Sequence, residues 1–368
     1  MNDVYSQTYQ GKTVLITGDS GFKGSWLSIC LLKLGARVIG YSLPPRTVED
    51  NYRLCRLDKH LTHINGDIND FPHLLQVFRL HQPEIVFHLA AQPIVLESYR
   101  NPLATFQTNI MGTANVMAAV GQVDSVRAVV IVTSDKCYEN REWIYRYREN
   151  DRLGGKDPYS ASKAAAEIVT SSYRDSFFSD EDSPVVATAR AGNVIGGGDW
   201  SPYRIIPDCI RALQADQPVI IRNPKSVRPW QHVLDSLSGY LQLGAYLYIY
   251  GNTYSGPWNF GPLNENTATV LEMVRELIRQ WGDGEYRINA EKDGLELPEA
   301  QLLHLDSSKA VSCLKWHPVL NLHQAIELTI KEYRIAGLSP EQILNQRIAH
   351  IDFYNHLKTT LGRVKYEL

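Results

Sequence analysis

The sequence predicts an α/β protein built on a doubly wound parallel sheet, followed by a smaller C-terminal lobe. Three observations support this fold class. A glycine-rich turn joins a strand to a helix near the start of the chain, short apolar strands alternate with helices over residues 12–191, and the alternation stops after residue 191. Strands that alternate with helices are joined by crossovers, so they form a parallel sheet.

The first unit of the sheet has the pattern of a dinucleotide site. The predicted strand 12–17 runs directly into the glycine-rich turn 18–24, which opens a helix ending at Gly35, and the strand 37–42 completes the unit. Glycines at such a turn let the backbone approach a pyrophosphate, whose charge is met by the helix N-terminus. The alternative is a glycine-rich turn without a ligand.

The end of the second strand does not decide between NAD and NADP. An acidic residue that would bind the ribose 2′-hydroxyl is expected about 20 positions after the glycines, but residues 41–44 read Tyr-Ser-Leu-Pro. Arg46 lies nearby, and an arginine there can hold a 2′-phosphate. Both cofactors therefore remain open at this point.

The alternation continues through four more strands. The third ends near residues 66–68, and the others are expected over 84–91, 128–132 and 184–191. Ligands of such sheets bind at the carboxyl ends of the strands. The residues that would gather there are Gly18, Asp67, Ala90, Ser134 and Asn193.

Two predicted helices flank these strands, and a third ends the chain. The first begins at Asn101–Pro102, with Leu103, Phe106, Ile110 and Val116 or Val120 on its apolar side. The second begins at Asp157–Pro158, where aspartate is a good N-cap and proline suits the first helical position. The third runs from Ser339 to about residue 361, with an apolar side made of Ile343, Leu344, Ile348 and Ile351.

The helix that begins at Pro158 carries a candidate acid–base pair. Tyr159 and Lys163 are four residues apart, so both lie on one helix face. A free phenol ionises near pH ~10, but a lysine ammonium and the helix N-terminus both favour the phenolate. Such a tyrosine can take a proton from a sugar or alcohol hydroxyl. The alternative is a surface helix that happens to contain both residues.

Polar side chains at the end of the fifth predicted strand make the pair more specific. Thr133, Ser134, Asp135 and Lys136 follow it without interruption. A hydroxyl, a carboxylate and an amine in consecutive positions at a strand end rarely serve packing.

Beyond residue 191, a basic stretch indicates either a diphosphate clamp or a solvated turn. It contains Arg222, Lys225, Arg228 and His232.

These motifs together resemble the extended short-chain dehydrogenase/reductase family. The segments 133–138 (Thr-Ser-Asp-Lys-Cys-Tyr), 190–200 (Arg-Ala-Gly-Asn-Val-Ile-Gly-Gly-Gly-Asp-Trp) and 228–234 (Arg-Pro-Trp-Gln-His-Val-Leu) are similar to those of its CDP-glucose 4,6-dehydratase group. The resemblance extends from about residue 10 to residue 330. Lys136 is typical of that group, because dehydratases of other nucleotide sugars carry a glutamate there.

The resemblance implies the chemistry and the role of each catalytic residue. Tyr159, supported by Lys163, would deprotonate the sugar O4 while Ser134 hydrogen-bonds the same oxygen. Hydride would pass from C4 to NAD, after which Lys136 would take the acidified C5 proton and Asp135 would protonate the departing O6. Hydride return to C6 completes the conversion of CDP-D-glucose to CDP-4-dehydro-6-deoxy-D-glucose. This step would belong to deoxysugar and O-antigen polysaccharide biosynthesis.

The resemblance also implies the binding residues. NAD would be held by Gly18, Gly21, Phe22, Lys23, Gly24, Asp67, Ile68, Leu89, Ala90, Ala91, Tyr159 and Lys163, and the nucleotide sugar by Asn193, Arg204, Arg228 and His232. No metal is expected. One departure concerns residues 92–97, where relatives carry an arginine and this chain has Leu96 followed by Glu97.

The family pattern implies an NAD-binding Rossmann domain over 1–191, to which 229–261 return. A nucleotide-sugar-binding lobe would comprise 192–228 and 262–330, and 331–368 would form a helical tail. Two helices per subunit, those beginning at Asn101 and Pro158, would pack into a homodimer or a dimer of dimers.

The composition excludes some classes of partner and indicates the cellular compartment. A formal net charge of −3 argues against nucleic acid, and no apolar run is long enough to span a membrane. The five cysteines form no Cys-x-x-Cys spacing, and the N-terminus has no apolar signal segment. We therefore expect a cytoplasmic enzyme.

Three other functions remain open. A dehydratase of another nucleotide sugar would share the mechanism and differ in the base-binding pocket. A nucleotide-sugar 4-epimerase would have no need of the Asp135–Lys136 pair. A non-catalytic dinucleotide sensor would need neither that pair nor Tyr159 and Lys163.

Overall fold

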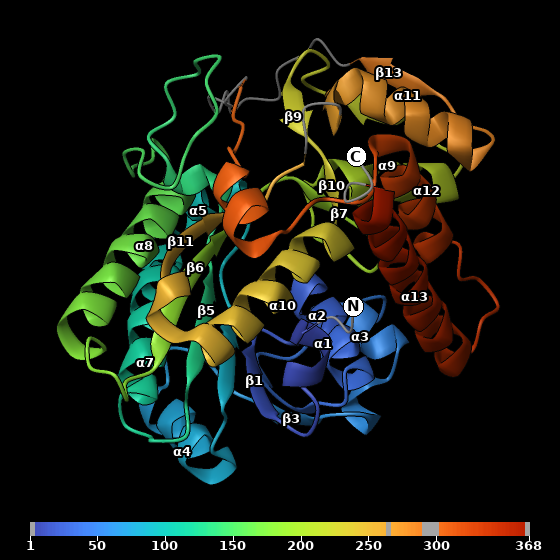
Figure 1. The fold of residues 1–368 in the computed structure, drawn as a ribbon. Helices are drawn as coiled ribbons and strands as arrows, with labels where there is room; N and C mark the ends of the chain where they lie inside the picture. Colours follow the sequence, from blue (N-terminus) through green and yellow to red (C-terminus); the bar gives the residue numbers. More distant parts are fainter. Residues whose placement is uncertain (1–3, 263–265, 289–301, 365–368) are drawn as a thin grey trace.

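The computed structural model describes residues 4–262, 266–288 and 302–364 (Figure 1). Within these ranges, a parallel seven-stranded sheet has the order β11-β6-β5-β4-β1-β2-β3. The order reverses between β1 and β4, where open parallel sheets bind their ligands. The predicted fold class is confirmed. The strands are β1 (Thr13–Thr17), β2 (Arg37–Ser42), β3 (Thr62–Asn65), β4 (Ile85–His88), β5 (Ala128–Val132), β6 (Val185–Arg190) and β11 (Gly256–Asn259).

Helices cover both faces of this sheet because its strand residues alternate between two apolar cores. Val14 and Ile16 of β1 belong to one core, and Leu15 to the other. The first core packs against α1 (Val4–Thr8), α2 (Phe22–Lys33), α10 (Val233–Tyr250) and α13 (Pro340–Val364). The second packs against α4 (Phe71–His81), α7 (Gly112–Val120) and the end of α8 (Pro158–Phe177).

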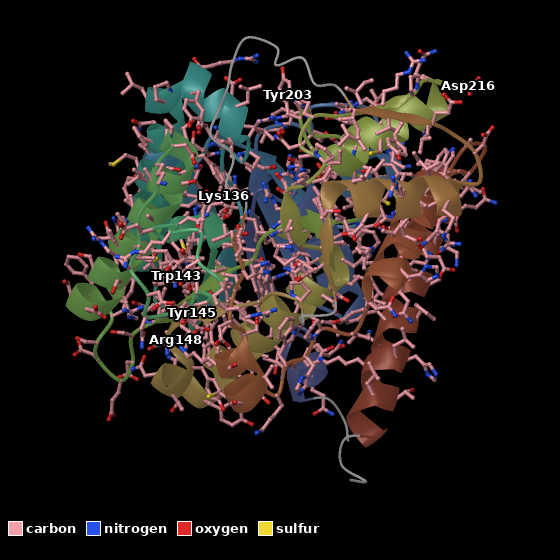
Figure 2. The ribbon with its side chains drawn as sticks, turned by 90° about the horizontal axis from the view of Figure 1, so that it is seen from above. Lys136, Trp143, Tyr145, Arg148, Tyr203 and Asp216 are labelled. Atoms are coloured by element: carbon pink, nitrogen blue, oxygen red, sulfur yellow. The ribbon has the colours of Figure 1, made fainter. Side chains whose placement is uncertain are left out.

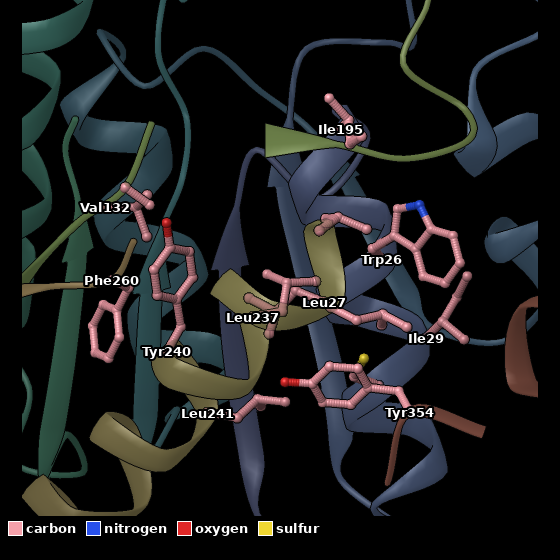
Figure 3. Close-up of a cluster of buried hydrophobic side chains, with 14 of the residues drawn as sticks. Trp26, Leu27, Ile29, Val132, Ile195, Leu237, Tyr240, Leu241, Phe260 and Tyr354 are labelled. Carbon is pink, nitrogen blue, oxygen red and sulfur yellow. The ribbon is translucent and has the colours of Figure 1, made fainter. Parts of the chain in front are cut away.

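The largest core lies between α10 and α2. Figure 3 shows Leu237 and Leu241 of α10 facing Leu27 of α2, with Tyr354 of α13 beside them. All four side chains are buried. This packing places the start of α2, and therefore the glycine-rich turn, on a rigid base.

The helix predicted from Asn101 is confirmed in position but not on all of its predicted apolar side. It consists of α6 (Pro102–Phe106), a π-helical turn (Gln107–Met111) and α7. Val116 and Val120 are fully buried, whereas Leu103 is 82% exposed. Leu103 lies in the first turn of α6 and belongs to neither apolar core of the sheet.

Short elements after β6 build the smaller lobe, at the top of Figure 1. Strand β7 (Val194–Ile195) pairs with β10 (Gln231–His232), β9 (Val227–Pro229) with β12 (Thr267–Thr269), and β8 (Val219–Ile221) with β13 (Tyr286–Ile288). The lobe also contains α9 (Ile205–Gln214), α11 (Val270–Trp281) and α12 (Leu322–Tyr333). Strand β11 returns to the main sheet; the domain boundaries themselves stay a prediction. The remaining short elements are α3 (Asn51–Leu54), α5 (Val95–Arg100), η1 (Leu57–Lys59), η3 (Asp135–Cys137), η4 (Gly251–Tyr254) and η6 (Ala310–Leu314).

The C-terminal helix α13 is part of the folded body. Ser339 caps it by accepting a hydrogen bond from the amide of Gln342 at 3.2 Å. Arg347 is fully buried and donates to the side-chain oxygen of Asn51 at 3.1 Å and to the carbonyl of Glu332 at 2.7 Å. Its guanidinium also lies over the ring of Trp26. The tail therefore ties α12 to α2 and α3.

Two features of the described residues concern membranes and metals. No helix among them is long and apolar enough to cross a membrane. No group of three or more metal-ligating side chains occurs in the same ranges.

Candidate active site

A cavity of about 1360 Å³ opens at the carboxyl ends of the strands. Its wall combines the β1–α2 turn, the ends of β4 and β5, the start of α8 and the loop 192–204. Every predicted site residue except His232 lines it. The sheet topology therefore gathers residues that are far apart in the sequence into one site.

The glycine-rich turn has the shape of a dinucleotide cradle. Gly18 has a φ of +81°, and a Cβ there would lie 2.7 Å from the amide nitrogen of Ala90. A Cβ on Gly24 would lie 2.0 Å from the carbonyl oxygen of Gly18. Side chains are therefore excluded, and the first amides of α2 face the cavity without intrahelical partners. These features fit a pyrophosphate at a helix N-terminus.

The adenosine side of the cradle is built on β2. Ser42 donates to the hydroxyl of Ser20 at 2.8 Å, and Ser20 donates to the carbonyl of Leu43 at 2.9 Å. The hydroxyl of Tyr41 donates to the carbonyl of Asp67 at 2.9 Å, which fixes the turn predicted to contact adenine. Arg46 lines the same region.

Tyr159 and Lys163 lie in the first turns of α8, as their spacing predicts. Asp157 caps the helix by accepting from the amide of Ser160 at 2.9 Å. Both side chains are almost fully buried, and the Lys163 ammonium donates to the carbonyl of Val132 at 3.3 Å. Lys163 is thus anchored to the end of β5, next to the predicted catalytic turn.

The electrostatics of this pair differ from the expectation of a ready phenolate. Burial raises the pKa of Tyr159 to about 12, although a hydrogen bond to Ser134 and the charge of Arg204 oppose this rise. Burial also lowers the pKa of Lys163 to about 8. Without a bound cation the tyrosine is therefore a protonated phenol at neutral pH.

The turn after β5 is organised around Asp135. Ser134 donates to the Asp135 carboxylate at 2.9 Å and accepts from the amide of Lys136 at 3.2 Å. A Cβ on Gly192 would lie 1.9 Å from a carboxylate oxygen of Asp135, so only glycine leaves room for this side chain. Lys136 is half-buried, lines the cavity and is labelled in Figure 2.

A buried ion pair fixes α8 against the sheet. Arg190 of β6 donates to both carboxylate oxygens of Glu167 on α8, at 2.9 and 2.7 Å. Glu167 also accepts from Thr188 at 2.7 Å and from Thr133. Sequence reasoning quoted Arg190 within a motif but gave it no role. The structure shows that it holds the helix carrying Tyr159 to the strand end carrying Ser134.

The substrate side is made mostly of loops. Asn193 lines the cavity with a φ of +50°, a strained conformation for a residue other than glycine. Arg204 pairs with Asp199 at 2.8 Å, and its charge lowers the pKa of both Lys23 and Tyr159. Arg204 therefore lies close to the reacting centre. Arg228 also lines the cavity, from β9.

His232 is the predicted substrate residue that the structure places elsewhere. It is fully buried, accepts from the amide of Leu234 at 3.3 Å and lies 3.3 Å from the carboxylate of Glu332. It thus caps α10, and its Nε2 lies within hydrogen-bonding distance of the buried Glu332 carboxylate on α12. Its side chain faces α12 and does not line the cavity, unlike the other predicted substrate residues.

Sequence reasoning also missed a cation at the cavity mouth. Arg100 lines the cavity and donates to the hydroxyl of Tyr203 at 3.4 Å. It lies four residues after Leu96, so both are on one face of α5. Arg100 therefore supplies positive charge one helical turn beyond Leu96, the position at which the family resemblance implies an arginine. The helical spacing was the signal that could have found it.

A family model described as GDP-mannose 4,6 dehydratase matches residues 15–329. The chain belongs to this family. The predicted membership of the extended short-chain dehydrogenase/reductases is thereby confirmed.

Curated relatives of this family member include dehydratases. The chain is 47% identical over 331 residues to the CDP-glucose 4,6-dehydratase of Salmonella typhimurium, which covers 89% of this chain and 91% of the relative. It is 27% identical over 335 residues to a dTDP-glucose 4,6-dehydratase of Xanthomonas campestris, with coverages of 87% and 93%.

Solved structures agree with the fold. The dTDP-glucose 4,6-dehydratase of Bacillus anthracis, in complex with NAD, matches with a TM-score of 0.72 at 20% identity and covers 89% of this chain and 98% of its own. DesIV of Streptomyces venezuelae, a dTDP-glucose 4,6-dehydratase with NAD bound, gives 0.75 at 23% identity, with coverages of 88% and 97%. At these identities the likeness concerns the fold alone.

Proposed function

We propose that the chain is an NAD-dependent 4,6-dehydratase that converts CDP-D-glucose to CDP-4-dehydro-6-deoxy-D-glucose and water. The observation that carries this proposal is the gathering of Ser134, Asp135, Lys136 and Tyr159 around one cavity with a dinucleotide cradle. The 47% identity to a CDP-glucose 4,6-dehydratase supports the choice of substrate.

The cradle residues would hold the cofactor. The turn 18–24 would bind the pyrophosphate, residues 67–68 the adenine side, and residues 89–91 with Lys163 the nicotinamide half. Bound NAD supplies a hydride acceptor that later gives the hydride back. The cationic ring would also favour ionisation of Tyr159, which burial alone opposes.

The first half of the reaction is an oxidation at C4. Tyr159 would take the proton from O4, and Ser134 would orient the same oxygen from the position in which it hydrogen-bonds the phenol. Lys163 would hold the tyrosine side of the site through its anchor on Val132. Asn193, Arg204 and Arg228 would bind the diphosphate of the substrate.

The second half is an elimination. A ketone at C4 acidifies the C5 proton, which Lys136 would remove. Asp135 would protonate O6 so that water leaves. The hydrogen bond from Ser134 and the bare Cα of Gly192 hold the Asp135 carboxyl in place for this step.

The alternatives differ in what they require of this turn. A 4-epimerase oxidises C4 but eliminates nothing, so an acid and an amine at positions 135 and 136 favour a dehydratase. A dehydratase of another nucleotide sugar would keep all four catalytic residues and differ only in its choice of base.

Mass spectrometry of CDP-glucose incubated with the protein and NAD tests the proposal. Loss of one water, with alkaline ultraviolet absorbance of a 4-keto sugar, is expected. Asp135→Asn should retain C4 oxidation but stop water loss, whereas Tyr159→Phe should stop both. Water loss only from a UDP-, GDP- or dTDP-sugar would contradict CDP-glucose as the substrate but would still support the dehydratase mechanism. Isotope exchange at C4 without any water loss would replace the dehydratase with an epimerase.

The subunit arrangement is also part of the proposal. Large apolar side chains are exposed on the neighbouring helices α6–α7 and α8, and the protein would cover them by forming a homodimer, which could pair into a dimer of dimers. Light scattering of Leu103→Glu and Ile168→Glu variants should report monomers. The exposed residues are Leu103 (82%), Met111 (48%), Ile168 (59%) and Phe177 (65%).

We further propose a cytoplasmic location for this enzyme.

A further inference from the structure

A buried carboxylate lies inside the glycine-rich turn and has no part in the mechanism above. Asp19, between Gly18 and Ser20, is fully buried and does not line the cavity. A Cβ on Gly40 would lie 2.1 Å from one of its carboxylate oxygens, so the side chain is pressed against β2. Burying an ionised carboxylate is costly unless it is paired.

Its partner is a histidine on β3. The Nδ1 of His63 lies 2.7 Å from Oδ2 of Asp19, and its Nε2 lies 3.0 Å from the side-chain oxygen of Asn65. In this arrangement both ring nitrogens face oxygen acceptors, which only the imidazolium form can satisfy. The second carboxylate oxygen of Asp19 has no hydrogen-bond partner among the described residues. The charge of His63 is therefore the main compensation for Asp19.

The groups around His63 agree with a charged ring. Burial lowers the pKa of His63, but the hydrogen bond and charge of Asp19, the hydrogen bond to Asn65 and the charge of Asp58 raise it above its ordinary value. The ring of Tyr52 packs against it, 5.1 Å between centroids, and carries no charge of its own at neutral pH because burial raises the pKa of this tyrosine further.

We propose that the Asp19–His63 ion pair is a positioning element of the cofactor site, which holds the glycine-rich turn against β2 and β3 and neutralises a carboxylate within it. The other hydrogen bonds that hold the turn to β2 join uncharged groups: the Gly18 amide donates to the carbonyl of Tyr41 at 2.9 Å, Ser42 donates to Ser20 at 2.8 Å, and Ser20 donates to the carbonyl of Leu43 at 2.9 Å. Loss of the His63 charge leaves an unpaired anion in the turn that receives a pyrophosphate. NAD affinity therefore depends on His63, although neither residue lines the cavity.

Calorimetric titration of the full chain with NAD tests this proposal without reference to activity. His63→Gln should weaken NAD binding about tenfold, because a buried carboxylate loses its partner. Adding Asp19→Asn to the H63Q variant should restore most of the lost NAD affinity, since no charge is then left unpaired. His60→Gln, at an exposed histidine nearby, is the matched control and should bind NAD as the wild type does.

Two further measurements separate a positioning role at the NAD site from a general structural role. If His63 only positions the turn, H63Q with saturating NAD should keep the wild-type kcat and the wild-type KM for the nucleotide sugar. The ratio of the H63Q and wild-type dissociation constants should also fall toward one as pH rises through the pKa of His63, because the wild type then loses the same charge. Lys23 is present in both proteins, so its titration cancels from this ratio.

Two results would overturn the proposal. One is a dissociation constant of H63Q equal to that of the wild type; the other is a D19N/H63Q double variant no tighter than H63Q. If H63Q does not fold, D19N alone decides the question. Its NAD affinity should decline less with rising pH than that of the wild type, and an identical decline would contradict the proposal.

Discussion

The two sides of the cavity are built in different ways. The cofactor side is mostly backbone: residues 18–24 and 89–91 approach so closely that a Cβ on Gly18 or Gly24 would overlap main-chain atoms. The substrate side consists of side chains from separate elements, such as Arg100 of α5, Arg204 before α9 and Arg228 of β9. Backbone surfaces tolerate almost no substitution, whereas side-chain surfaces can be altered one contact at a time. Mutations on the two sides should therefore differ in both size and kind.

The largest effect is expected at the tightest backbone contact. Gly24→Ala places a methyl group 2.0 Å from the carbonyl oxygen of Gly18, so the turn must open. We expect NAD affinity to fall at least about 100-fold, measured by calorimetry. Gly11→Ala is a useful control, because nothing lies within 4 Å of a Cβ there, although its φ of +72° costs some stability. Normal NAD binding by G24A would contradict a backbone-made cradle.

The next effect is expected where backbone and catalytic side chain meet. Gly192→Ala would push the Asp135 carboxyl from its place, and a displacement of about 1 Å can cost about 100-fold in rate. Water loss from CDP-glucose should slow by that factor while the dissociation constant for NAD stays the same. A G192A protein that loses NAD binding instead would show that the two sides are not separable here.

A smaller effect is expected at a single substrate-side cation. Arg204→Met removes a charged hydrogen-bond donor and should raise the KM for the nucleotide sugar about 20-fold. Because the Arg204 charge lowers the pKa of Tyr159, the rising limb of the pH–kcat profile should also move to higher pH.

The matched comparison for Arg204 is His232, which sequence reasoning assigned to the same site. His232→Gln should lower the melting temperature, since Glu332 loses a buried partner, and leave the KM unchanged. A raised KM for H232Q at unchanged stability would place His232 in the site after all.

The smallest effect concerns proton balance. Burial, together with the charges of Arg204 and Lys163, lowers the pKa of Lys23 to about 7. Above that pH the free protein holds a neutral Lys23, and a bound pyrophosphate should recharge it, so NAD binding takes up a proton at pH 8. Lys23→Met should lower this uptake by about one proton, read from binding enthalpies in buffers of different ionisation enthalpy. Equal uptake in K23M and wild type would contradict the shift.

The contrast between the two sides also explains what could be read from the sequence. A dinucleotide cradle requires glycines at fixed positions, and the acid–base pair requires two residues one helical turn apart. Gly18, Tyr159 and Lys163 were therefore predictable from the local sequence pattern. The strand-end group 133–136 was predictable because parallel strands place their ends together.

Fewer features of the substrate side were predictable from the sequence, for physical reasons. Whether His232 faces the cavity or α12 depends on the two-residue strand β10, which has no periodicity to read. The exposure of Leu103 and the ion pair between Arg190 and Glu167 depend on how separate elements pack, and the protonated state of Tyr159 depends on how deeply the finished fold buries it. None of these is a property of a local segment.

The C-terminal helix α13 has a consequence for how the protein is made. Arg347 contacts Asn51 across 296 positions of sequence, and Lys358 lies over the ring of Tyr5, near the start of the chain. The N-terminal half leaves the ribosome first, at about 5–20 residues per second. Its helices α2 and α3 keep an open flank until α13 has been translated. Synthesis of α13, rather than synthesis of the sheet, therefore sets when the cofactor half can close.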